Sequence, residues 1–110
     1  MLTISVCMIV KDEEAVLERC LACVKQFADE IIIVDTGSSD RTKEIAYSFT
    51  KQVFDYPWID DFAAARNEAF SKASCEYVMW LDADDVILDE DIAKLKRLKQ
   101  QGNHSVDIFL

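Results

Sequence analysis

The order of short apolar runs and amphipathic stretches limits the folds that this chain can adopt. Strand-like runs rich in β-branched or aromatic residues lie at 3–10, 30–35, 51–56 and 76–81. Stretches with a helical spacing of apolar residues lie at 13–27, 41–49, 62–73 and from Asp89 onward. Strands that alternate with helices over short connections are typical of a parallel sheet. We therefore expect an α/β protein with three α/β/α layers and a mainly parallel sheet.

The length of the chain, 110 residues, is that of one ordinary domain, and a hydrophobic content of 51% suffices for a packed core. No repeat or low-complexity linker divides residues 1–110, so we expect a single domain. Within it, "EYVMWL" is a nearly continuous apolar run, which predicts a strand buried on both faces. The terminal "VDIFL", at 106–110, predicts the start of a further strand.

The charge and hydropathy patterns argue against two kinds of partner. The formal net charge is -9, and Lys and Arg are scattered or gathered in the last helical stretch, so nucleic-acid binding is not expected. No apolar run reaches the ~18 residues of a membrane span. The N-terminal residues also lack the cationic start and cleavage site of a signal peptide. We expect no transmembrane segment and a cytoplasmic location.

The four cysteines include a close pair, Cys20 and Cys23, inside a helical pattern. A structural zinc site needs four thiolate or imidazole ligands, whereas Cys7 and Cys75 lie in or beside predicted strands. The single histidine, His104, is near the far end. We therefore interpret the cysteines as buried free thiols.

Acidic residues follow three of the predicted strands. Asp12 and Glu13 follow the first, Asp35 ends the second, and the run 82–85 follows the fourth and contains three Asp residues. Carboxylates packed this closely repel one another unless a cation or a donor-rich ligand balances them. Ligands of open parallel sheets bind beyond the carboxyl ends of the strands. These acids therefore predict a binding site at that edge.

The turn after the first strand reads "VKDEE" and carries no glycine, so a bare pyrophosphate would be repelled there. A hard divalent cation changes this, because Mg2+ or Mn2+ binds one or two carboxylates together with phosphate oxygens and water. The pattern is therefore compatible with a metal-bound diphosphate.

Three motifs in this order, "VDTGSSDRT", "ARN" and "WLDADD", follow the opening "SVCMIVKDEE". Together they resemble the N-terminal, nucleotide-sugar-binding half of family 2 glycosyltransferases, which have the GT-A (Rossmann-like) fold. The resemblance covers nearly the whole chain. It implies that the first strand lies between the second and the fourth.

The resemblance also implies roles for single residues. Asp35 would hydrogen-bond the base or ribose of the donor, and Asp12 and Glu13 would line the base pocket. Asp82 would face the ribose or donor sugar, and Asp84 would bind the Mn2+ or Mg2+ that bridges the diphosphate. Simpler explanations stay open: Asp35 could only form a turn, and the acidic cluster could only decorate a helix N-terminus.

Arg66 lies four residues after Phe62 and four before Phe70, so helical spacing places it on an apolar face, where an unpaired charge is costly. The resemblance implies that Arg66 contacts the donor base or neighbouring carboxylates. The alternative is a structural ion pair with Asp35 or Asp82.

The resemblance implies a metal-dependent, inverting transfer of sugar from a UDP- or GDP-type donor to a glycan, lipid or protein acceptor. The general base would lie beyond Leu110, since the acceptor-binding half is absent from these residues. We therefore expect a truncated donor-binding half, inactive alone. The sheet edge exposed after 106–110 would favour self-association.

Two other functions remain open at this stage. A receiver-like phosphoacceptor domain is also doubly wound and acidic, but its late strand-end lysine is not evident. A non-catalytic interaction module would use the acids only for solvation, and metal-dependent nucleotide binding would distinguish it from a donor-binding domain.

Overall fold

The computed structural model describes residues 3–56, 62–83 and 89–101. Strands and helices alternate along these residues. They are β1 (Ile4–Val10), α1 (Leu17–Val24), β2 (Glu30–Asp35), α2 (Thr42–Tyr47), β3 (Val53–Asp55), α3 (Phe62–Ser71), β4 (Tyr77–Trp80) and α4 (Asp89–Gln101). The alternation predicted from the sequence is therefore present.

The described strands form one four-stranded sheet in the order β3-β2-β1-β4. All three neighbouring pairs are parallel, and the register places Val10 beside Asp35 and Cys7 beside Trp80. The prediction of a mainly parallel sheet with β1 between β2 and β4 is confirmed. As a result, the carboxyl ends of β1, β2 and β4 meet at one edge.

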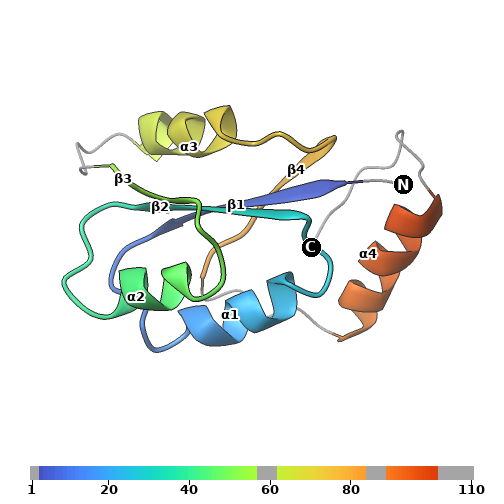
Figure 1. The fold of residues 1–110 in the computed structure, drawn as a ribbon, viewed down its shortest axis with the longest axis horizontal. Coiled ribbons are helices and arrows are strands. Elements are labelled where there is room, and N and C mark those ends of the chain that lie inside the picture. Colours follow the sequence, from blue (N-terminus) through green and yellow to red (C-terminus); the bar gives the residue numbers. More distant parts are fainter. Residues whose placement is uncertain (1–2, 57–61, 84–88, 102–110) are drawn as a thin grey trace.

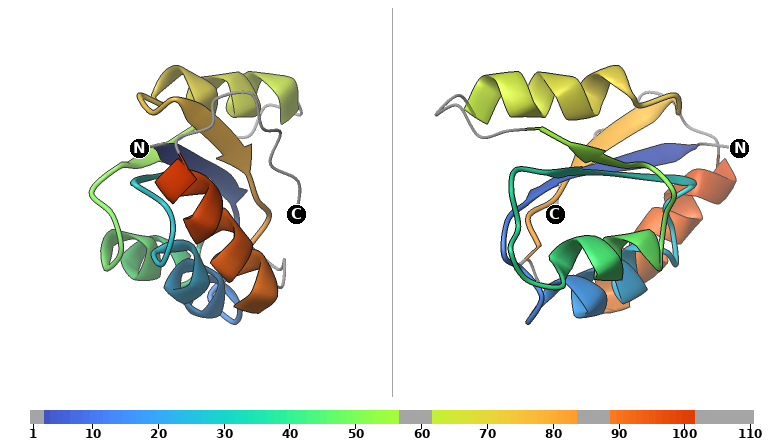
Figure 2. Two further views of the ribbon diagram at one scale, coloured as in Figure 1. Left: turned by 90° about the vertical axis from the view of Figure 1, so that its right-hand side faces the viewer. Right: turned by 60° about the vertical axis from the view of Figure 1, so that its left-hand side comes forward.

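Helices cover both faces of the sheet (Figures 1 and 2). Among the described helices, α3 covers one face, and α1, α2 and α4 cover the other. The larger core lies under α1 and α4, where Leu17, Leu21 and Leu95 pack against the inward side chains of β1. The smaller core lies under α3, where Ala69 packs near Ile32 and Val34. The three-layer α/β/α fold is confirmed.

β4 differs from the expected strand buried on both faces. Val78 is 46% exposed, whereas Met79 is buried. β4 lies at the edge of the four described strands, and α3 packs mainly on β1 and β2, reaching β4 through the ring contact of Phe70 with Trp80. The prediction of a strand is therefore confirmed, but the prediction of burial on both faces is wrong, because Val78 is exposed on one face while Met79 is buried on the other.

α1 is shorter than the helix predicted at 13–27. It begins at Leu17 because Val16, with a φ of -125°, departs from helical geometry, although the Glu13 carbonyl already accepts the N–H groups of Val16 (3.1 Å) and Leu17 (2.9 Å). After Val24 the chain tightens, and the Phe27 N–H returns to the Val24 carbonyl over 3.1 Å, as in a 3₁₀ turn. α2 and the later strands are likewise shorter than their sequence patterns.

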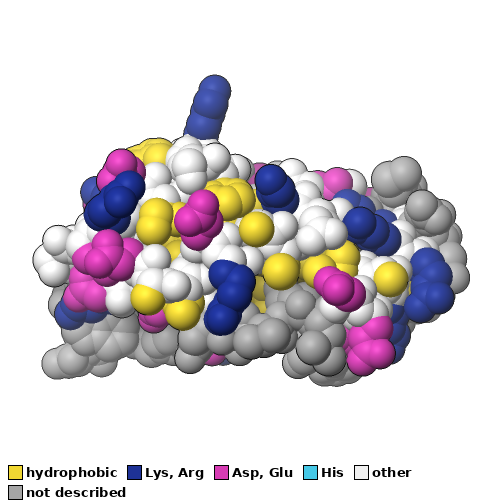
Figure 3. All heavy atoms as spheres, turned by 90° about the horizontal axis from the view of Figure 1, so that it is seen from below, with side chains coloured by type: hydrophobic (Ala, Val, Ile, Leu, Met, Phe, Trp, Pro, Cys, Tyr) yellow, Lys and Arg dark blue, Asp and Glu magenta, His cyan; other side chains and the backbone are white. Residues whose placement is uncertain are grey.

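The face covered by α1, α2 and α4 carries acidic and basic side chains interspersed with hydrophobic ones (Figure 3). Among the described helices, none is both long enough and apolar enough to cross a membrane. The predicted strand at 106–110, and the self-association assigned to the edge beyond it, lie outside the described residues.

All four cysteines are free. Cys7 and Cys20 are buried, but Cys23 and Cys75 are only half-buried, so the expectation of burial is wrong for these two. Burial and the nearby carboxylate of Glu30 raise the pKa of Cys7 to about 11, which keeps its thiol protonated at neutral pH.

Glu30 joins several segments at the amino edge of the sheet. Its carboxylate accepts hydrogen bonds from Ser5 Oγ (2.7 Å), Gln52 Nε2 (3.0 Å), and the Ser74 N–H and Oγ (both 2.9 Å). Burial alone would raise the pKa of Glu30, but these donors outweigh it and lower the pKa to about 2. Glu30 thus holds β1, the start of β3 and the turn before β4 together.

Replacing Glu30 by Gln is expected to lower the free energy of unfolding by about 1–3 kcal/mol near pH 7, because charge-assisted hydrogen bonds are lost. The folded pKa lies below the ordinary value of 4.5, so the wild-type advantage is full above pH 4.5 and disappears as the pH falls toward 2. Urea unfolding at pH 7 and pH 2.5 measures both effects.

Glu44→Gln serves as the control. Glu44 is exposed on α2 and pairs only at the surface, with Arg41 Nε at 3.1 Å, so its loss should cost about 0.5 kcal/mol or less. Equal losses for the two variants would contradict the role assigned to Glu30.

Candidate functional site

Asp35 occupies the last position of β2 and is 3% exposed. Its Oδ1 accepts the backbone N–H groups of Gly37 (2.9 Å) and Ser38 (2.8 Å). Gly37 has a φ of 116°, which favours glycine, so this tight turn depends on its residue type. The turn-forming role considered from the sequence is therefore real.

Asp35 Oδ2, in contrast, is buried and has no hydrogen-bond partner among the described residues. It therefore does not hydrogen-bond Arg66. A buried acceptor without a partner is costly, on the order of 1–3 kcal/mol, and such groups mark places where a ligand supplies the missing donor. The turn thus fixes one oxygen of Asp35 and leaves the other free to bind.

Hydrogen bonds join the loop after β1 (residues 12–14) to the loop after β2 (residues 38–42), and we call this set of bonds the loop clamp. Backbone N–H groups of the first loop donate to side-chain oxygens of the second: Asp12 to Ser38 Oγ (2.9 Å), Glu13 to Thr42 Oγ1 (2.7 Å) and Glu14 to Asp40 Oδ2 (3.3 Å). Both loops lie at the left of Figure 1, at the carboxyl edge of the sheet.

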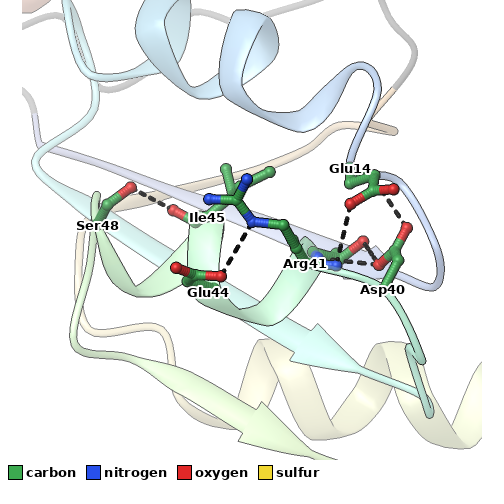
Figure 4. Close-up of polar contacts among 7 residues, drawn as sticks. Glu14, Asp40, Arg41, Glu44, Ile45 and Ser48 are labelled. Carbon is green, nitrogen blue, oxygen red and sulfur yellow. Dashed lines mark hydrogen bonds and ion pairs between the residues drawn. The ribbon is translucent and has the colours of Figure 1, made fainter.

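The second loop also donates to the first. Asp12 Oδ1 accepts the Ser39 N–H (2.8 Å), and Glu14 Oε2 accepts the Arg41 N–H (3.2 Å). Figure 4 shows the carboxylates of Glu14 and Asp40 reaching toward each other's loop. The hydroxyl of Thr42 lowers the pKa of Asp40 below its ordinary value, and the backbone N–H groups of Thr42 and Glu14 add to this effect. The charged form of Asp40 is therefore stabilised by the donors of the clamp.

Asp12 has a φ of 53°, in the left-handed region, which non-glycine residues seldom adopt but which Asp tolerates. The side chain of Asp12 is exposed, and one of its oxygens accepts from the N–H and hydroxyl of Ser39. Asp12 thus helps to hold the two loops together at the predicted site.

Arg66 lies on α3 above the end of β4. Its guanidinium carbon is 5.3 Å from the ring centroid of Phe70 and 5.1 Å from that of Trp80, and the two rings meet edge to face. The side chain is exposed, so the burial implied by helical spacing is not found. Cation–π contacts place the charge beside apolar rings without burying it.

Asp82 comes two residues after Trp80, just beyond the end of β4, and its side chain is exposed. Its backbone carbonyl is 3.9 Å from Cys20 Sγ on α1. Among the described residues no group of three or more His, Cys, Asp or Glu side chains could hold a metal. Asp84, the predicted metal ligand, lies outside the described residues.

The structure brings the predicted residues to the edge in two groups. Asp12, Glu13 and Asp35 lie around the ends of β1 and β2, and Arg66 and Asp82 lie around the end of β4. Sequence reasoning missed the residues of the second loop that hold the first group in place. The sequence patterns assign no role at the site to Ser39 or Asp40, although "TGSSDRT" is rich in short polar side chains that bond backbone groups.

The family model described as Glycosyl transferase family 2 matches residues 5–109. The chain belongs to this family. The match covers the loop clamp, Asp35, Arg66 and Asp82, so the resemblance inferred from the motifs is confirmed.

Curated relatives of this family member are longer. A TPR repeat-containing protein of Synechococcus elongatus is 45% identical over 96 residues, which cover 87% of this chain and 24% of the relative. A poly-beta-1,6-N-acetyl-D-glucosamine synthase of Staphylococcus epidermidis is 50% identical over 66 residues, which cover 56% of this chain and 16% of the relative. The chain therefore spans about a quarter or less of the length of these relatives.

Solved structures with the same fold include glucosyl-3-phosphoglycerate synthase from Mycobacterium tuberculosis. Its complex with Mg2+ and uridine diphosphate matches with a TM-score of 0.65 and 26% identity, over 76% of this chain and 34% of that chain. Its complex with Mn2+, UDP-glucose and phosphoglyceric acid matches with a TM-score of 0.66 and 25% identity, over 77% and 34%. These neighbours confirm the GT-A fold class.

Proposed function

We propose that this chain binds the nucleoside diphosphate of a sugar donor at the carboxyl edge of its sheet, as the donor-binding part of a glycosyltransferase. One observation carries the proposal: Asp35 Oδ2 is buried and without a hydrogen-bond partner among the described residues. A base N–H or a ribose hydroxyl supplies the missing donor. A non-catalytic module whose acids only solvate its surface would not explain a carboxylate oxygen that is shielded from water.

The other residues at the edge would complete the donor site. Asp12 and Glu13 would line the base pocket, and the loop clamp already holds their backbone. Arg66, stacked on Trp80, would offer a fixed positive charge to the base or to neighbouring carboxylates. Asp82, at the end of β4, would face the ribose or sugar.

A divalent cation fits this edge. Mg2+ and Mn2+ in nucleotide sites need only one or two carboxylates beside phosphate oxygens and water, so a ready cluster of three protein ligands is not required. Asp84, two residues after Asp82 in the sequence, would hold the ion. When bound, the ion would offset the negative charge of the departing nucleoside diphosphate.

UDP is the donor nucleotide to test first, because the structurally similar synthase was solved with UDP and UDP-glucose. GDP remains the alternative. In the whole protein we propose transfer with inversion to a glycan, lipid or protein acceptor, with a general base outside these 110 residues. The acids at this edge are already assigned to donor and metal.

The proposal predicts that the 110-residue chain binds UDP or GDP in the presence of Mn2+, with an affinity that falls when EDTA removes the metal. It also predicts no sugar transfer from UDP-sugars by this chain alone. Calorimetric titrations with and without Mn2+, and a transfer assay beside them, measure both.

Two outcomes would contradict the proposal. Absence of nucleotide binding would favour a non-catalytic interaction module. Nucleotide affinity that is the same with and without Mn2+ would contradict the metal-binding role proposed for Asp84. Sugar transfer by this chain would overturn only the placement of the base. A receiver domain is no longer a candidate, because residues 5–109 match the glycosyl transferase family 2 model.

A further inference from the structure

Thr42, the first residue of α2, is fully buried, so its side chain cannot touch a ligand bound at the sheet edge. Its hydroxyl nevertheless links the two loops of the clamp. Thr42 Oγ1 accepts the Glu13 N–H over 2.7 Å and donates to Asp40 Oδ1 over 2.5 Å. A threonine hydroxyl that is both donor and acceptor has its bonding capacity nearly used in this one place.

Asp40 extends the link in both directions along the clamp. Its Oδ1 accepts the Thr42 N–H over 2.9 Å, and its Oδ2 accepts the Glu14 N–H over 3.3 Å. Asp40 and Thr42 therefore satisfy two adjacent backbone donors, those of Glu13 and Glu14, which α1 does not use. Without them, these two donors of the first loop would have to turn to water.

Ser38 connects the clamp to Asp35. Its backbone N–H donates to Asp35 Oδ1 over 2.8 Å, and its Oγ accepts the Asp12 N–H over 2.9 Å. A shift of the first loop would therefore move Ser38 through its bond to the Asp12 N–H. Ser38 in turn helps to fix the rotation of the Asp35 carboxylate through its own N–H. Because one oxygen of Asp35 is held in this way, the direction of the unpartnered Oδ2 depends on the clamp.

We propose that Thr42, acting with Asp40, is a positioning residue for donor binding. It holds the loops after β1 and β2 at a fixed separation and thereby orients Asp35 Oδ2, without contact to the donor. This inference rests on the proposed function of the same edge. The energetic reason is preorganisation: loops already fixed in the free protein lose less freedom on binding.

A matched pair of variants tests the proposal. Thr42→Val keeps the shape and removes the hydroxyl, whereas Thr42→Ser keeps the hydroxyl. In UDP titrations with Mn2+, Thr42→Val should raise Kd about tenfold with unchanged stoichiometry. Thr42→Ser should stay within about twofold of the wild type. A purely structural role would instead lower the fraction of folded, binding-competent chain and leave its Kd unchanged, and this outcome would overturn the proposal.

A second pair covers the case in which Thr42→Val does not fold. Asp40 is only half-buried, so Asp40→Ala removes the same link with little packing loss. It should weaken UDP binding as Thr42→Val does. Glu44→Gln removes an exposed charge from α2, the helix that begins at Thr42, and should leave Kd unchanged. Equal effects of Asp40→Ala and Glu44→Gln would contradict the proposal.

A readout without nucleotide separates this inference from the proposed function. In NMR spectra of the free chain, the amide signals of Gly37 and Ser38, which donate to Asp35, should move in Thr42→Val and Asp40→Ala but not in Thr42→Ser. Unmoved signals would overturn the positioning role whether or not UDP binds. Moved signals in a chain that binds neither UDP nor GDP would uphold the link to Asp35 and reject the proposed function.

Discussion

Replacing Asp35 by Asn is expected to weaken UDP binding about 100-fold while leaving the fold intact. The amide can still accept from Gly37 and Ser38 through one oxygen. The unpartnered Oδ2, however, becomes an NH2 group, which cannot accept a base N–H and lacks the charge. A hydrogen bond to a charged group contributes about 1.5–3 kcal/mol, and repulsion between two facing donors adds to the loss.

The stability of Asp35→Asn should differ from the wild type by about 1 kcal/mol or less, and it can be higher. The wild type buries a carboxylate oxygen that has no partner, so the substitution exchanges one unsatisfied group for another without charge. Residues that bind ligands often reduce the stability of the free protein in this way. Urea unfolding without nucleotide measures this part.

Asp55→Asn provides a control at the same sheet edge. Asp55 is the register neighbour of Asp35 on β3, but it is exposed and pairs with Lys43 at 2.6 Å. Its substitution should change UDP affinity less than about twofold, since an exposed ion pair contributes about 1 kcal/mol at most. Similar losses for Asp35→Asn and Asp55→Asn would mean that net charge, and no particular oxygen, governs binding.

The sheet could be predicted because its signals are local and repeated. Runs such as "EIIIVD" combine β-branched residues with an acid at the end, and β2 occupies this same stretch, Glu30–Asp35. The strand order came from the family resemblance, since spacing alone does not decide which strands are neighbours. The register then follows, and it places Asp35 beside Val10 at the edge.

The details of the site could not be predicted, because they depend on contacts between distant residues. Glu13 and Thr42 are 29 positions apart, and no sequence pattern shows that a buried hydroxyl accepts from that backbone N–H. Helical periodicity also predicts the start of α1 four residues too early, because the non-helical φ of Val16, -125°, separates the preceding turn from the helix. Arg66 was expected on a buried face, but stacking on Trp80 keeps its charge at the surface.

The second large effect concerns the metal. Asp84→Ala is expected to remove the Mn2+-dependent part of UDP binding, whereas Asp89→Ala should retain it. Both substitutions remove one carboxylate from the same stretch of sequence, which makes them a matched pair. Asp84 follows the strand-end Asp82 in "LDADD", and Asp89 is an exposed residue in the first turn of α4. An acid there is accounted for by the positive end of the helix dipole.

The expected size follows from what a ligand does for a hard cation. Loss of an outer-shell partner alone weakens metal binding about 10- to 100-fold, so loss of a direct carboxylate ligand should cost at least about 100-fold. Titration of Mn2+ in the presence of UDP, followed by calorimetry or by the paramagnetic signal of the ion, measures this for each variant. If Asp89→Ala weakens Mn2+ binding as much as Asp84→Ala does, the metal is held by the general negative field of this acidic chain, and the assignment to Asp84 is wrong.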